Sequence, residues 1–310
     1  MWPRISIVTP SFNQAKFLEE TIRSVLDQSY PNFEYMVIDG GSSDGSVEII
    51  RKYEKRLAYW TSESDRGQAD AINKGWRRAT GEILAYLNSD DTYYPGALRL
   101  AAEAFAYDSS IGLVYGRCNV IDEHGAVLRE RRVRDASFAD VLRWSPSIPQ
   151  PSLFVRRAAV EAVGFLRPEL HYTMDYDLSL RIGLKSKMQF IPHVLANMRD
   201  HRAAKTALDP LRHVEEGIGV AENFFTQSLP ADIASLKEKT VATLLVRKAR
   251  VLSRLGRGAE ARAVIAQALR RFSDSSVGRD AAAAWAMSLI GPNAIGGLRR
   301  LKRAWLRRSP

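Results

Sequence analysis

The adjacent carboxylates Asp90 and Asp91, which follow an apolar run, have the clearest potential for chemistry in this sequence. Two neighbouring carboxylates repel each other unless a cation lies nearby. Their hard oxygen atoms suit Mg²⁺ or Mn²⁺, and proteins commonly share such ions with substrate phosphates. A capped turn before Pro95 accounts for the same residues equally well. The pair alone therefore indicates either a metal site or a turn.

A second candidate site is the turn from Asp39 to Gly45, which also follows an apolar run. Its glycines let a ligand approach the backbone closely. A carboxylate at this place can accept hydrogen bonds from a nucleobase N–H or from a ribose hydroxyl. The residues alone favour the simpler alternative, which is a loop in which Asp44 or Ser43 caps the next helix.

Three further polar side chains lie later in the chain. Asp175 and Asp177 stand at the start of a helical pattern. A carboxylate there can act as a general base, or it can simply complement the positive end of the helix dipole. For His201 a surface position is the favoured interpretation, and metal ligation is the alternative.

These side chains need a scaffold that brings the ends of separate strands together. Apolar runs predict strands at 5–9, 35–38, 57–60, 83–87, 113–115, 120–121, 152–155 and 190–191, and helical spacing predicts helices at 15–28, 47–53, 68–79 and 175–187. In the first 120 residues the strands and helices alternate, which is typical of parallel strands buried on both faces. Ligands of such sheets bind beyond the carboxyl ends of the strands, where the polar clusters fall.

The composition is that of a globular protein. Of the 310 residues, 45% are apolar and 26% are charged, which excludes a disordered chain and a collagen. Cys118 is the single cysteine of the sequence, so an intrachain disulfide is excluded and a reducing compartment fits. We expect no signal peptide, because the first residues run directly into a strand-like segment. From about residue 205 the pattern is helical, and residues 241–272 predict two helices joined by a glycine-containing turn at 256–258.

Six motifs of this sequence resemble those of the family 2 glycosyltransferases, which have the GT-A fold, and they occur in the same order. They are TPSFN at 9–13, VIDGGSSDG at 37–45, SDRGQADAINKG at 64–75, NSDD at 88–91, MDYDL at 174–178 and HRAAKT at 201–206. The resemblance covers about residues 4–206. It implies an α/β catalytic domain at 1–206, with a mostly parallel central sheet flanked by helices, and an α-helical C-terminal extension at 207–310.

The resemblance also implies a reaction, in which a sugar moves from a nucleotide-sugar donor, typically a UDP-sugar, to an acceptor hydroxyl with inversion at the anomeric carbon. It assigns Thr9, Pro10 and Asp39 to the nucleobase, with Asp44 as a weaker member of that pocket, and Asp65 to the ribose or diphosphate. It assigns Asp90 to the ribose and sugar, Asp91 to a divalent metal (Mn²⁺ or Mg²⁺), and His201 to the metal or diphosphate. Asp175 takes the role of catalytic base. A divalent cation would stabilise the charge that develops on the leaving nucleoside diphosphate. A single inversion requires only one carboxylate on the acceptor side.

One departure from the family pattern concerns the diphosphate. Many members carry an arginine in the segment that reads Ala-Ile-Asn at 71–73 of this chain. Because that arginine is missing, we expect the diphosphate contact to pass to Arg66 or Lys74.

A second departure concerns the base. Met174 stands where many members carry a glutamate, and we expect Asp175 rather than Asp177 to be the base, with Asp177 anchoring the helix. Trp144 and Gln150 are candidates for the acceptor pocket. A polar loop before an edge strand is an equally good interpretation of that segment.

The excess positive charge lies in the C-terminal part of the chain. Residues 241–310 carry 15 Lys and Arg against 3 Asp and Glu, whereas residues 1–240 carry 30 against 32. Residues 281–298 hold no charge, and six cations follow in residues 299–308, where Trp305 and nearby leucines share one helical face. A basic amphipathic helix with tryptophan indicates a membrane-surface element. A solvated basic tail is the alternative, and the slight negative charge of the catalytic part disfavours nucleic acid as a partner.

These observations predict a cytoplasmic enzyme, peripheral at the inner face of a bacterial cytoplasmic membrane. Its acceptor would be a glycan or a lipid-linked glycan in the synthesis of a surface polysaccharide or glycolipid. Two alternatives stay open, which are a catalytically inactive protein that binds sugar nucleotides and an interaction protein that works through its helical region. A Rossmann dehydrogenase is disfavoured, because no Gly-x-Gly-x-x-Gly motif follows the first strand.

Overall fold

The structure is a computed structural model that describes residues 2–131, 133–144, 148–272 and 274–290. The chain divides into two compact units, Met1–Ala204 and Lys205–Pro310. Each unit has its own apolar core.

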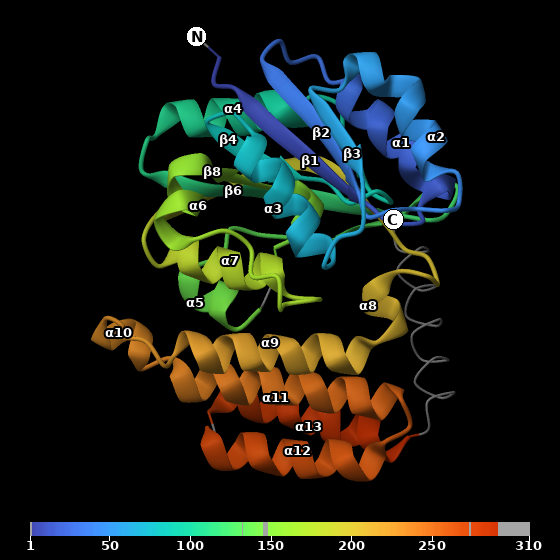
Figure 1. Ribbon diagram of the computed structural model, residues 1–310. Helices are drawn as coiled ribbons and strands as arrows, with labels where there is room; N and C mark the ends of the chain where they lie inside the picture. The colour runs from blue at the N-terminus through green and yellow to red at the C-terminus, as the bar shows by residue number, and fades with distance from the viewer. Residues whose placement is uncertain (1, 132, 145–147, 273, 291–310) are drawn as a thin grey trace, which may run out of the picture. The chain divides into compact units, whose positions relative to one another are not determined.

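The first unit is a nine-stranded sheet with helices on both faces (Figure 1). Its strands are β1 (Ile5–Ser11), β2 (Phe33–Asp39), β3 (Tyr59–Ser62), β4 (Ile83–Tyr86), β5 (Thr92–Tyr93), β6 (Ile111–Ile121), β7 (Val127–Arg131), β8 (Leu153–Arg156) and β9 (Lys187–Arg199). Its helices are α1 (Ala15–Leu26), α2 (Ser46–Tyr53), α3 (Gln68–Arg78), α4 (Ala97–Tyr107), α5 (Phe138–Leu142), α6 (Arg157–Val163) and α7 (Met174–Gly183), with short 3₁₀ turns at Glu54–Arg56 and Gln150–Ser152.

The sheet has the strand order β3-β2-β1-β4-β8-β6-β9-β5, and β7 pairs with β6. The first four strands of this order are parallel, whereas β8 runs antiparallel to both β4 and β6. In register, Ser11 lies beside Asp39, and Asp39 lies beside Ser62. The carboxyl ends of β1, β2 and β3 therefore meet at one edge of the sheet.

The two faces of the parallel strands are covered by different helices. Ile5 and Ile7 of β1 point into a core that includes apolar residues of α1, α2 and α4. Val8 points to the other face, where α3 crosses the sheet (Figure 1). Gly75 of α3 allows this close packing, because a Cβ at that position would lie 2.5 Å from Cγ2 of Val8. Burial on both faces explains why the strands read as continuous apolar runs.

The predicted α/β fold with a helical C-terminal region is confirmed, but several predicted elements differ from the observed ones. The strands expected at 113–115 and 120–121 are one strand, β6, and the strand expected at 190–191 is part of β9. The third strand begins at Tyr59 rather than residue 57, because the preceding 3₁₀ turn is closed by a hydrogen bond from Leu57 N to Glu54 O. The helix expected at 175–187 ends at Gly183, because Lys187 is already paired with Ile111 of β6.

In the described residues of the second unit, the regular secondary structure is helical, and the helices are joined by short loops. Its helices are α8 (Lys205–Leu208), α9 (Pro210–Phe224), α10 (Ala231–Ala234), α11 (Lys237–Arg254), α12 (Gly258–Arg271) and α13 (Ser275–Leu289). Helix α11 packs against α9, α12 and α13 through small and branched apolar side chains. In the described part of the chain no helix has the length and apolarity to cross a membrane. The basic segment at 299–308 lies outside the described residues.

Candidate active site

Asp39 is the best-held carboxylate at the edge where β1, β2 and β3 end. Its side chain is fully buried, and its Oδ2 accepts hydrogen bonds from the backbone N–H of Ser42 at 2.8 Å and from Oγ of Ser62 at 2.7 Å. Oγ of Ser42 donates to the other oxygen, Oδ1, at 2.6 Å. A carboxylate oxygen can accept two hydrogen bonds. Oδ1 of Asp39 is therefore fixed in place with capacity for one more donor.

The end of β1 contributes four residues to this edge. Thr9 is fully buried, and its hydroxyl accepts a hydrogen bond from the Tyr35 hydroxyl at 2.8 Å. Pro10 is buried next to it. Ser11 is only 4% exposed, and its Oγ is among the few buried side-chain atoms of the described residues with no hydrogen-bond partner. Phe12, by contrast, is 62% exposed.

Ser11 and Phe12 lie at this edge, but neither was among the site residues predicted from the sequence. A large aromatic residue directly after a buried strand and before a polar turn was the available signal for Phe12. Nothing in the sequence pattern distinguishes Ser11, because its exceptional feature is an unsatisfied hydroxyl in a buried position. Such a group is costly unless something satisfies it.

Asp44 lies in the same turn, and its oxygens are occupied by backbone and side-chain donors. Oδ2 accepts from Ala15 N at 2.9 Å, and Oδ1 accepts from Oγ of Ser46 at 2.6 Å. Burial acts to raise the pKa of Asp44, but these hydrogen bonds outweigh it and the pKa is lowered. Asp44 thus accepts from backbone N–H groups at the start of both α1 and α2, although the N-cap position of α2 is occupied by Gly45 and not by Asp44.

Asp65 lies against the turn that follows Asp39. Its Oδ1 accepts a hydrogen bond from Gly67 N at 2.7 Å. A Cβ on Gly40 would lie 2.8 Å from Oδ2 of Asp65 and 3.3 Å from the Phe12 ring. The missing side chain at position 40 is therefore what allows Asp65, Phe12 and the Asp39 turn to come together.

Arg66 and Lys74 meet at a third carboxylate, Asp70, on α3. Arg66 Nη2 donates to Asp70 Oδ1 at 3.0 Å, and Lys74 Nζ lies 3.9 Å from Oδ2. The hydrogen bond from Arg66 is the main cause of the lowered pKa of Asp70. The Arg66 side chain is 78% exposed. The two cations expected to contact the diphosphate, Arg66 and Lys74, thus lie near each other beside Asp70. Asp70 was not among the site residues predicted from the sequence.

Asp90 and Asp91 follow β4, and residues from the end of β9 hold both of them. Asp91 is buried, and its Oδ1 accepts from Arg199 N at 2.9 Å. His201 Nε2 lies 2.9 Å from Asp90 Oδ2. Burial, and then the negative charge of Asp90, raises the pKa of Asp91 well above its ordinary value. The surface position favoured for His201 from the sequence alone was wrong, because its side chain is only 3% exposed.

The donor set around Asp91 suits a divalent cation that is completed by a substrate. The described residues contain no group of three or more His, Cys, Asp and Glu side chains arranged to hold a metal ion. Mg²⁺-type sites commonly use one or two carboxylates and take their other ligands from substrate phosphates and water. Burial and the neighbouring charge of Asp90 disfavour the charged form of Asp91, which a bound cation would stabilise. Asp91 and Asp90 therefore fit a metal shared with a diphosphate, and they do not fit a closed protein-only metal site.

A chain of side-chain amides connects the metal loop to neighbouring elements. Asn88 Nδ2 donates to Gln150 Oε1 at 3.0 Å, and Gln150 Nε2 donates to the backbone oxygen of Tyr86 at 2.9 Å. Gln68 of α3 donates to Asn88 Oδ1 at 2.6 Å. Gln150, expected near the acceptor, thus lies directly beside the residues that follow β4.

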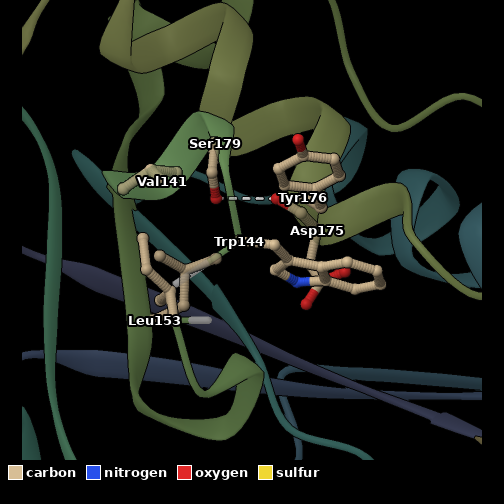
Figure 2. A pocket seen from close by; sticks show the side chains of 7 residues that line it. Val141, Trp144, Leu153, Asp175, Tyr176 and Ser179 are labelled. Carbon is tan, nitrogen blue, oxygen red and sulfur yellow. Dashed lines mark hydrogen bonds between the residues drawn. The ribbon is translucent and has the colours of Figure 1, made fainter. Parts of the chain in front are cut away.

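Asp175 lines a small pocket with an apolar wall (Figure 2). The pocket is also lined by Val141, Trp144, Ile148, Leu153, Tyr176 and Ser179. The Trp144 ring stacks on Tyr176 with 5.2 Å between centroids, and the Trp144 backbone has a φ of +55°, a conformation uncommon for a non-glycine residue. The charges of Asp175 and Asp91 both contribute, after burial, to the raised pKa of Tyr86.

Asp177 has different surroundings. It is 4% exposed, and its two oxygens lie 3.2 Å from Arg167 Nη1 and 2.7 Å from Arg181 Nη2. Arg181 also donates to the backbone oxygens of 163, 164 and 165. Asp177 is thus part of a buried ion-pair network that fastens α7 to the loop after α6.

Comparison with known proteins defines the class of protein to which this fold and site belong. The model of the family described as "Glycosyl transferase family 2" matches residues 6–164. The chain belongs to this family, and it is a glycosyltransferase.

Three similar proteins are informative. A putative teichuronic acid biosynthesis glycosyltransferase, TuaG of Bacillus subtilis, is 35% identical over 129 residues, which cover 41% of this chain and 51% of that protein. The mannosyltransferase PcManGT from Pyrobaculum calidifontis, solved in complex with GDP-Man and Mn²⁺, has a TM-score of 0.66 at 21% identity and covers 98% of this chain and 86% of that chain. S. aureus TarS 1–349, solved in complex with UDP-GlcNAc, has a TM-score of 0.62 at 17% identity and covers 79% of this chain and 72% of that chain. At these identities the two solved structures support the fold.

Proposed function

We propose that the protein transfers a sugar from a nucleoside-diphosphate sugar, with UDP-sugars as the first candidates, to an acceptor hydroxyl with inversion at the anomeric carbon. The observation that carries the proposal is the arrangement directly after β4, where Asp91 is buried and accepts a hydrogen bond from Arg199 N at 2.9 Å, and Asp90 Oδ2 lies 2.9 Å from His201 Nε2. These carboxylates suit a cation on the diphosphate side of a donor. Asp175, from α7, lines a small pocket together with Trp144 and Tyr176 and would face the acceptor.

The donor base would bind at the ends of β1 and β2. Oδ1 of Asp39 is held so that it can accept a hydrogen bond from a base N–H. The unpartnered hydroxyl of Ser11 in the neighbouring strand gives a second polar contact. The exposed ring of Phe12 offers an apolar face to the planar base. Thr9 and Pro10 would shape the floor of this pocket, and Asp44 would keep the turn in place.

The diphosphate would lie between this pocket and the loop after β4. Asp65 would face the ribose or diphosphate, and Arg66 and Lys74 would offer positive charge to the phosphates. Asp91, with Asp90 and His201 beside it, would hold a divalent ion of the Mn²⁺ or Mg²⁺ type. When bound, such an ion stabilises negative charge on the leaving diphosphate.

Asp175 would remove the proton from the acceptor hydroxyl as it attacks the sugar. Its placement in the wall of the pocket with Trp144 and Tyr176 supports this role. The two arginine partners of Asp177 support a structural role for that second carboxylate. One base suffices for a single inverting displacement, because no covalent enzyme intermediate has to be resolved.

The biological role that we propose is the synthesis of a bacterial surface polysaccharide or glycolipid. The similarity to TuaG, whose name refers to teichuronic acid biosynthesis, supports this class of acceptor. Cytoplasmic work at the inner face of the membrane would place the enzyme beside lipid-linked acceptors. The six cations at 299–308 support a peripheral attachment of this kind.

The test of the proposed function is donor cleavage by the purified full-length protein. UDP-, GDP- and dTDP-sugars are incubated with and without Mn²⁺, and the released nucleoside diphosphate is measured. We expect release from one class of donor, dependent on the metal. Release from none of them under any metal condition would contradict the proposal and favour an inactive binding protein.

A further inference from the structure

Arg199, the last residue of β9, is buried beside the Asp90–Asp91 loop although no motif of the sequence singled it out. Its side chain is 0% exposed, whereas that of its ion-pair partner Glu20 on α1 is 53% exposed. Arg199 Nη2 donates to Glu20 Oε2 at 2.6 Å, and the guanidinium carbon lies 4.8 Å from the centre of the Phe17 ring. The positive charge of Arg199 is thus satisfied from α1 and shielded from solvent.

The remaining donors of Arg199 reach two other segments. Nε donates to the backbone oxygen of Asp90 at 2.9 Å, and Nη1 donates to the backbone oxygen of Asp122 at 2.9 Å. Its backbone N–H donates to Asp91 Oδ1 at 2.9 Å. One residue therefore contacts the chain at both carboxylates and ties their loop to α1 and to the end of β6.

The surrounding contacts place the same loop against α1. Thr21 Oγ1 donates to the backbone oxygen of Asp91 at 2.7 Å. The His201 ring packs on Phe17 with 4.9 Å between centroids. The loop has a turn hydrogen bond of its own, from Asp91 N to Asn88 O, but it is also anchored through atoms of β9 more than 100 residues away in sequence. Its geometry therefore depends on β9 as well as on its own turn.

We propose that Arg199 is a positioning residue, which holds the backbone of Asp90 and the carboxylate of Asp91 in the orientation needed to bind a divalent cation together with the donor diphosphate. This inference rests on the proposed function, because it concerns the same site. Because the side chain of Arg199 is enclosed by protein, its effect would pass through Asp90 and Asp91. A planar guanidinium can bridge Asp90, Asp122 and Glu20 at once, whereas a lysine ammonium offers a single compact charge.

Arg156 offers a matched control. It too is the last residue of a strand, although it is only partly buried. It donates to the backbone oxygens of Ile111, Phe105 and Asp108, and it lies over the Phe105 ring at 5.1 Å. These contacts do not include the Asp90–Asp91 loop. Loss of Arg156 therefore tests for the general effect of removing a buried arginine.

The experiment compares Arg199→Met, Arg199→Lys, Glu20→Gln and Arg156→Met in the full-length chain. Calorimetry gives the affinity for UDP with and without Mn²⁺, and thermal unfolding without ligand gives the stability. We expect the Mn²⁺-dependent gain in UDP affinity to fall about tenfold or more in Arg199→Met, which corresponds to about 1.4 kcal/mol. The Mn²⁺-dependent gain should fall less in Arg199→Lys and less again in Glu20→Gln. In Arg156→Met it should stay at the wild-type level.

Two results would overturn the proposal for Arg199 alone. One is that both Arg199 variants keep the full gain in UDP affinity that Mn²⁺ gives the wild-type protein. The other is that Arg156→Met loses as much of that gain as Arg199→Met does. If Arg199→Met does not fold, Arg199→Lys and Glu20→Gln decide the outcome by the same criterion. A wild-type chain that gains no UDP affinity from Mn²⁺ would instead contradict the metal site in the proposed function, and the role of Arg199 with it.

Discussion

The two halves of the proposed donor site are held in different ways. Asp39 is fixed by its own turn and by the adjoining strand, through Ser42 and Ser62. Asp91 is fixed by the end of β9, and its pKa is raised by burial and by Asp90. The nucleotide half is thus held by its own turn and by the neighbouring strand β3, whereas the metal half depends on contacts with β9, more than 100 residues away in sequence.

The largest expected effect is on turnover, and it should leave nucleotide binding by both halves of the donor site unchanged. Replacing Asp175 with asparagine should lower turnover about 10²-fold or more, which is the usual scale of general base catalysis. UDP affinity should stay nearly unchanged, because the proposed role of Asp175 is on the acceptor side. Steady-state rates of nucleoside diphosphate release, measured together with UDP calorimetry, check this.

Asp177→Asn is the control for that experiment. It removes a charge from the buried pair with Arg167 and Arg181, and breaking such a pair costs about 3–5 kcal/mol of folding stability. We expect a lower melting temperature and a smaller loss of turnover per folded molecule. If Asp177→Asn costs more turnover than Asp175→Asn, the base has been assigned to the wrong carboxylate.

The next largest effect should appear in the metal half. Asp91→Ala should abolish the part of UDP affinity that depends on Mn²⁺, and leave the affinity measured without metal nearly unchanged. The reason is that in the proposed site Asp91 offers its carboxylate to the cation and lies outside the base pocket. Calorimetry with and without Mn²⁺ measures both quantities, and a persistent Mn²⁺ effect in the variant would show that the cation binds elsewhere.

A smaller effect is expected in the nucleotide half. Ser11→Ala removes a buried hydroxyl that has no partner in the described protein. Folding stability should therefore stay the same or rise slightly. UDP affinity should fall about fivefold both with and without Mn²⁺, because the loss of one hydrogen bond costs about 1 kcal/mol. A destabilised variant with unchanged UDP affinity would mean that the hydroxyl serves the fold rather than the ligand.

The smallest effect concerns the membrane. A chain ending at residue 297 should sediment less with liposomes that contain anionic lipid than the full chain does. Each Lys or Arg near such a surface contributes about 1 kcal/mol, and the difference should shrink at high salt as the screening length falls from about 10 Å at 0.1 M to about 3 Å at 1 M. Equal binding by both chains, or no dependence on lipid charge, would refute the attachment.

The same division between local and long-range structure decides what could be predicted from the sequence. The strands, the helices and the clusters at Asp39 and Asp91 follow from apolar periodicity and from polar residues at strand ends, which are local signals. The burial of His201 and the contacts of Arg199 depend on how the end of β9 meets a loop more than 100 residues earlier, and no local pattern encodes that meeting. The unsatisfied hydroxyl of Ser11 was hidden for the same reason, because it depends on packing around β1.

The most direct test of the account is the stereochemistry of donor hydrolysis, in which water takes the place of the acceptor. The full-length protein is incubated with Mn²⁺ and the α-linked nucleoside-diphosphate sugar that it cleaves, and the released sugar is followed by NMR before mutarotation. A single displacement assisted by one base predicts that the β-anomer appears first, and that its release slows in Asp175→Asn. Initial release of the α-anomer, or release at an unchanged rate by Asp175→Asn, would contradict the account.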